Sequence, residues 1–205
     1  MAFNAELSRT GWMSRIWLGL MLLLAVSAQA GQPFFLLPEP SFMARKGTQP
    51  IPDAKSTVLA PAQMGEFGLE FPTAEQWAAA TVAEADLAAS TRAAASDWLK
   101  QLKVEPVRGP NKVVEYVKLS STKVPACGAV LAPEFAQQFE EVLGPKPLVV
   151  MPNRSTVYVF PALAGKHAQY SAMVLTAWHS REPRVSLEVF ELTAKGLRAV
   201  GTFEE

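Results

Sequence analysis

The pattern of apolar and polar positions divides the chain into three parts. An unbroken apolar run occupies residues 16–26, and a proline-rich stretch follows as far as residue 61. In the remainder, apolar positions recur at the periods of helices and strands, which indicates a folded domain. We therefore interpret residues 62–205 as one domain, preceded by a leader (1–30) and an arm (31–61).

An alanine-rich stretch predicts a long helical segment at the start of the domain. Thr73 and Gln76 stand at the spacing of a capping box, and alanine is the best helix former. A single helix over residues 74–102 would be about 43 Å long at 1.5 Å per residue. Such a helix would span the whole domain, whose expected radius of gyration is on the order of 16 Å, so we expect a break near Ser90-Thr91.

Beyond residue 110 the apolar pattern alternates between strands and helices. It predicts a strand at 112–119, a helix at 133–144, a hairpin at 147–160, a helix at 167–178 and a closing hairpin from strands at 185–192 and 197–203. Consecutive hairpins favour antiparallel pairing, with helices packed on one face. The sequence thus predicts an α+β fold in which a mostly antiparallel sheet of about five strands follows the alanine-rich helical segment.

Residues 1–30 have the organisation of a secretory signal peptide. Arg9 and Arg15 precede the apolar run, and Ala28 and Ala30 stand where a cleavage site needs small residues. A membrane-spanning helix needs about 20 apolar residues, and this run is shorter. We expect cleavage after Ala30, no membrane span in the mature chain, and a periplasmic or secreted location. The alternative is an uncleaved N-terminal anchor.

The arm over residues 31–61 is rich in proline. Each proline fixes its own φ and removes a hydrogen-bond donor, so we expect an extended segment outside the sheet. Its apolar patch "PFFLLP" (33–38) would invite association if it were exposed. The arm is therefore expected to dock on its own domain, on a second copy, or on a partner.

Charge and composition exclude two classes of partner. The chain holds 19 Lys and Arg against 19 Asp and Glu, and the basic residues are scattered among the acids. A nucleic-acid-binding protein instead gathers its cations on one face. A protein of the membrane surface needs a basic amphipathic helix, which the sequence lacks.

A polar joint interrupts the apolar hairpin "PLVVMPNRSTVYVF" (147–160). Pro152 suits the first central position of a turn and Asn153 tolerates the second, so turn chemistry explains the joint. An arginine at a rigid tip could instead grip a carboxylate or phosphate through two parallel hydrogen bonds. Asn153 and Arg154 are accordingly the candidate ligand-binding residues.

The longer stretch "GAVLAPEFAQQFEEVLGPKPLVVMPNRSTVYVF" (128–160) resembles a segment of a widespread bacterial family of uncharacterised proteins. In that family, a helix with an acidic end leads into an apolar strand, a Pro-x-Arg-Asp turn and a second apolar strand. Here the turn reads Pro152-Asn153-Arg154-Ser155, with serine at the position of the family's aspartate. The resemblance implies an α+β fold and names no reaction.

Few residues of this chain are suited to catalysis or metal binding. Cys127 is the only cysteine, and Cys127 with His179 is the sharpest combination of nucleophile and base. A small buried hydrophobe is the alternative role for this cysteine. His167 and His179 do not follow a metal-binding spacing. Phosphate-loop, dinucleotide and nucleophile-elbow signatures are absent from the sequence, so we expect neither a metal nor a cofactor.

Taken together, these patterns favour an exported, non-enzymatic module that binds another protein of the cell envelope. One alternative is a hydrolase or transferase that uses Cys127 and His179. Another is a small-anion binder at Arg154.

Overall fold

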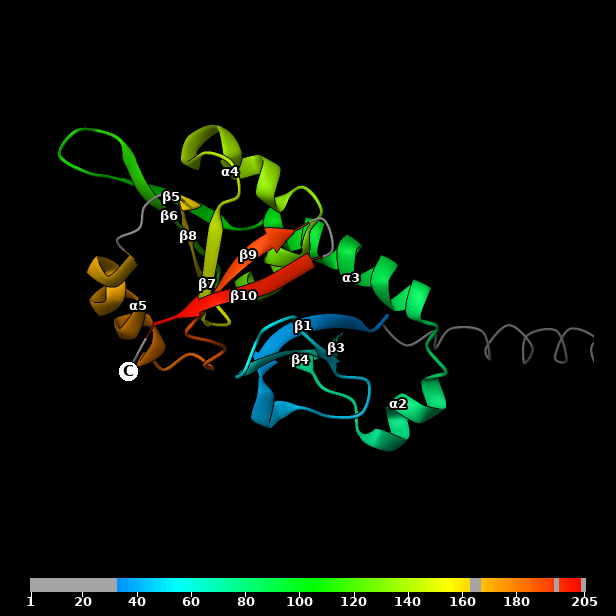
Figure 1. Cartoon of the computed structure of the whole chain (residues 1–205). Coiled ribbons are helices and arrows are strands. Elements are labelled where there is room, and N and C mark those ends of the chain that lie inside the picture. The colour runs from blue at the N-terminus through cyan, green and yellow to red at the C-terminus, as the bar shows by residue number, and fades with distance from the viewer. Residues whose placement is uncertain (1–32, 163–166, 194–195, 204–205) are drawn as a thin grey trace, which may run out of the picture. The chain divides into compact units, whose positions relative to one another are not determined.

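Two antiparallel sheets with helices packed on them make up residues 33–162, 167–193 and 196–203, which a computed structural model describes (Figure 1). The predicted α+β class is confirmed. The prediction of a single sheet of about five strands was wrong, because one sheet has six strands and the other has four. The predicted signal peptide (1–30) lies outside the described residues.

The larger sheet has the strand order β10-β9-β7-β8-β6-β5, and each strand is antiparallel to its neighbours. Its strands are β5 (Lys103–Arg108), β6 (Val114–Ser120), β7 (Leu148–Asn153), β8 (Thr156–Phe160), β9 (Glu188–Thr193) and β10 (Gly196–Thr202). Both predicted hairpins are present, and Gly196 has the positive φ that the closing turn requires. The strand predicted at 112–119 is β6. Its partner β5 was missed, because an edge strand with exposed charges and Pro106 lacks the usual apolar alternation.

Both faces of the larger sheet are covered by helices, whereas one covered face was predicted. Neighbouring residues of a strand point to opposite faces, and in β8 both sets are apolar. Val157 and Val159 belong to the cluster that contains Trp98, while Tyr158 and Phe160 belong to a second cluster. The first face carries α3 (Glu84–Leu99), the 3₁₀ helix η2 (Ala126–Leu131) and α4 (Phe135–Leu143), and the second face carries α5 (Ser171–Trp178).

The smaller sheet is formed mainly by the proline-rich segment. Its strands are β1 (Phe35–Pro40), β2 (Gln49–Pro50), β3 (Thr57–Gly65) and β4 (Gly68–Glu70), and β3 pairs with the other three. The prediction of an arm outside the sheet differs from this arrangement, since every residue of β1 is buried. The prolines fit because β1 is an edge strand with a single strand partner, where Pro38 and Pro40 need not donate to a second ladder.

The alanine-rich stretch forms two helices, α2 (Ala74–Ala80) and α3. The predicted capping box is confirmed, because the Thr73 hydroxyl accepts from the Gln76 N–H and the Gln76 side chain accepts from the Thr73 N–H. The break was predicted near residues 90–91, but the structure places it at Thr81, whose φ of 45° is left-handed.

Ser90 and Thr91 stay inside α3 because their hydroxyl groups join the helix to β1. Both hydroxyls donate to the carbonyl oxygen of Leu87 within the helix. Thr91 Oγ1 also accepts from the Leu36 N–H at 2.9 Å, and Ser90 Oγ also contacts the Phe34 carbonyl oxygen. These bonds satisfy backbone groups of β1 on the side away from β3.

The two remaining predicted helices are also present. The first is α4, which ends at Gly144 in a left-handed conformation, and the second is the 3₁₀ helix η4 (His167–Tyr170) continued by α5. Among the described residues, no helix combines the length and apolar character that crossing a membrane requires.

Candidate functional site

The polar joint singled out in the sequence forms the tip of the β7–β8 hairpin. Residues 154–155 make the turn, because Asn153 pairs with Thr156 across it. Pro152 and Asn153 were predicted to occupy the turn, but both belong to β7. The strand continues this far because its backbone has a further partner, as the Val185 N–H donates to the Pro152 carbonyl oxygen at 3.1 Å.

Asn153 is buried and its side chain is fully engaged. Its Nδ2 donates to the Ala177 carbonyl oxygen at 2.7 Å and to Ser180 Oγ at 3.1 Å. Its Oδ1 accepts from both the N–H and the hydroxyl of Ser155 at 3.1 Å. The amide therefore fixes the turn and ties it to the end of α5.

Arg154 makes a two-point ion pair with Glu39 of β1. Its Nε lies 2.6 Å from Glu39 Oε1 and its Nη2 lies 2.9 Å from Glu39 Oε2. The Glu39 side chain is 1% exposed and the Arg154 side chain 22% exposed. The two-point grip that the sequence suggested for a ligand is thus made with a carboxylate of the chain itself, and it links the two sheets.

Burial affects the two partners unequally. Desolvation raises the pKa of the Glu39 carboxyl, although the hydrogen bonds and charge of Arg154 oppose that shift. Burial acts to lower the pKa of the Arg154 guanidinium, but the hydrogen bonds and charge of Glu39 raise it. The directions fit the geometry, because the carboxylate is the more deeply enclosed partner.

The ring of Phe71 packs against two guanidinium groups. The guanidinium carbon of Arg45 lies 4.4 Å from the ring centre, and that of Arg154 lies 5.0 Å from it. Such contacts are attractive because the ring face is electron-rich. Arg45 also donates from Nε to the Met43 carbonyl oxygen at 3.1 Å, so it is held beside the Glu39–Arg154 pair.

Cys127 lies in η2 beneath this ion pair and is fully buried. Its N–H donates to the Arg154 carbonyl oxygen at 3.2 Å, and its thiol lies 3.9 Å from the Pro38 carbonyl oxygen. Burial, and then the charge of Glu39, raise the pKa of the thiol far above its ordinary value. Reactive cysteines show the opposite shift together with exposure.

His179 has different surroundings from Cys127. It follows α5 and is exposed, and its Nδ1 lies 3.4 Å from Nη2 of Arg184. The thiol belongs to the cluster on one face of the larger sheet, whereas α5 covers the other face. The hypothesis of a Cys127–His179 pair stays a prediction that this placement does not favour. His167 begins η4, and no potential metal site of three His, Cys, Asp or Glu residues occurs within the described ranges.

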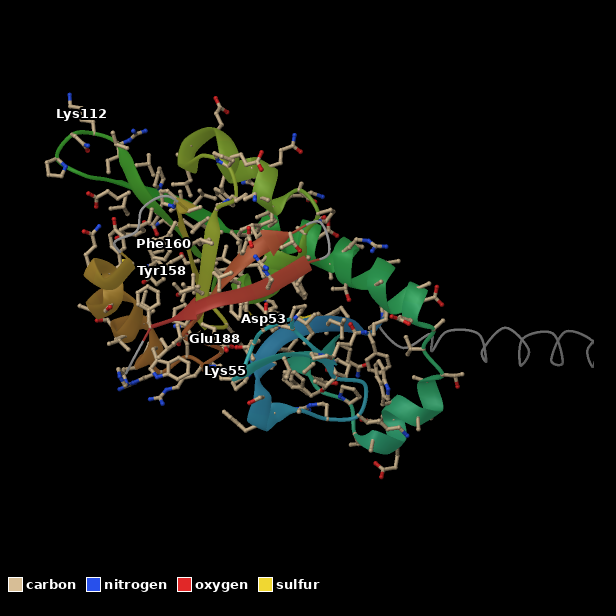
Figure 2. The ribbon with its side chains drawn as sticks, in the orientation of Figure 1. Asp53, Lys55, Lys112, Tyr158, Phe160 and Glu188 are labelled. Atoms are coloured by element: carbon tan, nitrogen blue, oxygen red, sulfur yellow. The ribbon has the colours of Figure 1, made fainter. Side chains whose placement is uncertain are left out.

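Glu188 of β9 provides a second polar link between the sheets (Figure 2). Its carboxylate is buried and accepts from the N–H groups of Lys55 and Ser56 at 2.6 and 3.3 Å. It also accepts from the Thr57 hydroxyl at 2.6 Å. In this link the carboxylate comes from the larger sheet, whereas in the Glu39–Arg154 pair it comes from the smaller sheet.

A hollow of about 250 Å³, which we call the tip hollow, opens beside the Arg154 turn. Its walls come from the β3–β4 hairpin, the 121–125 loop and the hairpin tip. The lining residues are Met64, Gly68, Leu69, Ser121, Thr122, Lys123, Val124, Pro125, Arg154, Ser155, Glu182 and Pro183. The hollow therefore combines an apolar surface with charged groups of both signs.

Phe67 stands at the turn of the β3–β4 hairpin, directly before the lining residue Gly68, and its side chain is 92% exposed. Neither this hairpin nor a role for Phe67 was predicted from the sequence. A signal was present, because Gly65 and Gly68 bracket Glu66-Phe67, and Gly68 has a positive φ. Of the residues that line the hollow, only Arg154 had been proposed as a ligand contact.

No family model, curated protein or solved structure matches this chain. The resemblance of residues 128–160 to a family of uncharacterised bacterial proteins therefore stays a prediction.

Proposed function

We propose that this chain is an exported, non-enzymatic module that binds an extended segment of another envelope protein in the tip hollow. The observation that carries the proposal is the position of Phe67. This large aromatic side chain is 92% exposed, and the residue that follows it, Gly68, lines the tip hollow. Exposed apolar surface next to a hollow is typical of interaction sites.

The composition of the tip hollow supports a protein partner. Protein interfaces combine an apolar centre with a polar rim, and aromatic anchors contribute much of their binding energy. Met64, Leu69 and Val124 supply the apolar part, while Lys123 and Glu182 supply charges of opposite sign. The volume of about 250 Å³ lies below the usual range of small-molecule pockets and suits one apolar side chain of a partner.

The walls of the hollow are held in place before any partner binds. Arg154 is fixed by Glu39, and the turn that carries it is fixed by the buried amide of Asn153. A prearranged surface loses less conformational entropy on binding. The same bonds engage Arg154 and Asn153, the two candidate ligand-binding residues, with partners of the chain itself.

The expected partner segment is extended, with one apolar side chain flanked by charged residues. An acidic residue would meet Lys123 and a basic residue would meet Glu182. Such complementarity contributes specificity more than affinity.

Export is part of the proposal and has its own test. The leader over residues 1–30 supports delivery to the periplasm or the exterior. Mass spectrometry of the protein purified from its producing cells should give a mature chain that starts at Gly31. A full-length chain in the membrane fraction would instead support the uncleaved anchor.

Site-specific photo-crosslinking tests the binding surface. A photoreactive phenylalanine analogue is placed at Phe67 in one variant and at Phe42 in another, since both side chains are highly exposed. Phe42 is the matched control because it lies in the 3₁₀ helix η1 (Ser41–Met43), which contributes nothing to the lining of the tip hollow.

We expect a defined adduct with one envelope protein from position 67 and no such adduct from position 42. The substitution Lys123→Glu should reduce the yield at position 67, because it reverses a charge on the rim. Equal adduct patterns from both positions, or a pattern at position 67 that is insensitive to Lys123→Glu, would refute the proposed surface.

A further inference from the structure

A second cavity, of about 350 Å³, is lined in part by residues of η2 and is separate from the tip hollow. We call it the α3–α4 cavity. Arg92 contributes to it from α3, and the remaining lining residues are Val130, Leu131, Ala132, Pro133, Ala136, Leu192, Thr193, Gly196 and Leu197. Residues of β9 and β10 on either side of their turn form one wall of the cavity.

Seven of the ten described lining residues of the α3–α4 cavity are leucine, valine, alanine or proline. These aliphatic side chains come from two separate parts of the chain, residues 130–136 and 192–197, and the described lining contains no aromatic residue. The volume falls within the range of small-molecule sites, which begins at about 300 Å³. The alkyl chain of a small ligand matches this surface, because burial of its methylene groups would supply most of the binding free energy.

Arg92 is the only charged side chain that the described lining contributes to this cavity. Within the described residues, Arg92 makes no ion pair, in contrast to Arg154 and Arg198. The neighbouring carboxylate of Glu134 is engaged, since Ser96 Oγ donates to its Oε2 at 2.9 Å. One guanidinium is therefore available at the edge of an aliphatic cavity.

From this arrangement we infer that the α3–α4 cavity binds a free medium-chain carboxylate. The alkyl chain occupies the aliphatic interior, and the carboxylate accepts two parallel hydrogen bonds from Arg92. One guanidinium balances one carboxylate, whereas a phosphate carries more charge than a single cation neutralises. The inference does not depend on the proposed partner of the tip hollow, because the two cavities share no lining residue.

Calorimetric titration of the mature protein with octanoate is the direct test. Octanol and octylamine keep the alkyl chain but replace the carboxylate with a neutral or a cationic group. Octanoate should bind saturably, on the order of tenfold tighter than octanol, because a charge-assisted hydrogen bond is lost with the alcohol. Each methylene removed should weaken binding by about fourfold, so butyrate should bind far more weakly than octanoate.

Two variants locate the site. Arg92→Ala should weaken octanoate binding on the order of tenfold and leave octanol binding unchanged. Ala136→Phe should abolish the binding of both, because the larger side chain fills the cavity. Lys100→Ala is the matched control, because Lys100 is an exposed cation immediately after α3 and does not line the cavity.

Several outcomes would overturn the inference. These are no saturable binding of octanoate at millimolar concentration, equal affinity for octanoate and octanol, or wild-type affinity in Arg92→Ala. Wild-type affinity in a folded Ala136→Phe protein would place any binding elsewhere. Arg92→Ala decides the matter if Ala136→Phe fails to fold, because residue 92 is exposed and alanine is favourable in a helix.

Discussion

Arg154 and Glu39 bind each other at two points across the junction of the two sheets, with N–O distances of 2.6 and 2.9 Å. They lie 115 residues apart in the sequence. The carboxylate is enclosed almost completely, so each partner depends on the other for its counter-charge. Removing one partner should therefore be far more damaging than removing both.

Arg154→Ala should lower the free energy of unfolding by about 3–5 kcal/mol, because it leaves a buried carboxylate without a counter-charge. Urea unfolding followed by circular dichroism measures the loss. The double variant Arg154→Met with Glu39→Leu should recover much of it. The exposed pair of Lys100 and Asp97 provides the control, and Lys100→Ala should cost at most about 1 kcal/mol. A loss for Arg154→Ala no larger than that of the control would contradict a structural role for the pair.

Glu188→Gln should destabilise the protein by about 1–3 kcal/mol, because an amide offers one acceptor oxygen where the carboxylate offers two. One of the N–H or hydroxyl donors of residues 55–57 would then face the NH₂ group of the glutamine side chain. Glu191→Gln on the same strand is the control, since Glu191 makes a surface ion pair with Arg198 and its loss should cost under about 1 kcal/mol. Equal midpoints for the two variants in thermal unfolding would show that the link at Glu188 contributes nothing special.

The Cys127 thiol should be inert to iodoacetamide in the folded protein and should react only after unfolding. Burial raises the pKa of this thiol, so the folded state keeps its proton at pH values where the unfolded thiol ionises. Rapid labelling of native protein at neutral pH, detected by mass spectrometry, would show that the thiol is accessible and would revive the nucleophile hypothesis.

The same shift predicts a pH dependence of stability. An unfolded cysteine ionises near pH 8.5, at about its ordinary pKa, while the folded thiol stays protonated. Above about pH 8.5 this group should lower the free energy of unfolding by up to about 1.4 kcal/mol per pH unit. Cys127→Ala lacks the ionisable group, so the stability difference between wild type and variant should change steadily from about pH 8 to about pH 10 in favour of the variant. A constant difference across that range would disprove the shift.

Thr91→Val should cost about 1–3 kcal/mol, because it removes the acceptor of the buried Leu36 N–H with little change in side-chain shape. Amide hydrogen exchange at Leu36 should also become faster relative to the rest of β1. Thr176→Val in α5 is the control, since that exposed hydroxyl bonds only within its own helix. A variant as stable as the control would mean that water replaces the lost acceptor.

Elements with a local signal were predicted correctly from the sequence. The β7–β8 hairpin has apolar runs on both sides of a polar joint, the β9–β10 hairpin has apolar strands flanking a turn that contains Gly196, and the capping box of Thr73 and Gln76 spans four neighbouring residues. Strand β1 was misinterpreted because its prolines favour extended structure but give no sign of a buried edge position. Helices on both faces of the larger sheet were not predicted. The strand "TVYVF" is apolar at every position after its first, so its sequence does not show which face is buried.

The candidate site depended on contacts that no local pattern contains. Arg154 was singled out for a two-point grip on a ligand, but its partner is Glu39, in a segment that was predicted to lie outside the sheet. The burial of Cys127 likewise depends on β1 and on the hairpin tip together. Long-range pairings of this kind appear only when the sheets are assembled.

Each sheet contributes one carboxylate to the other. Glu39 of the smaller sheet is neutralised by Arg154 of the larger sheet, and Glu188 of the larger sheet accepts hydrogen bonds from residues 55–57 of the smaller sheet. Separation of the two sheets would therefore leave the carboxylates of Glu39 and Glu188 without their partners at the same time. Neither half can loosen independently under mild stress, and the chain from residue 33 onward should melt as one cooperative unit instead of losing its proline-rich strands first.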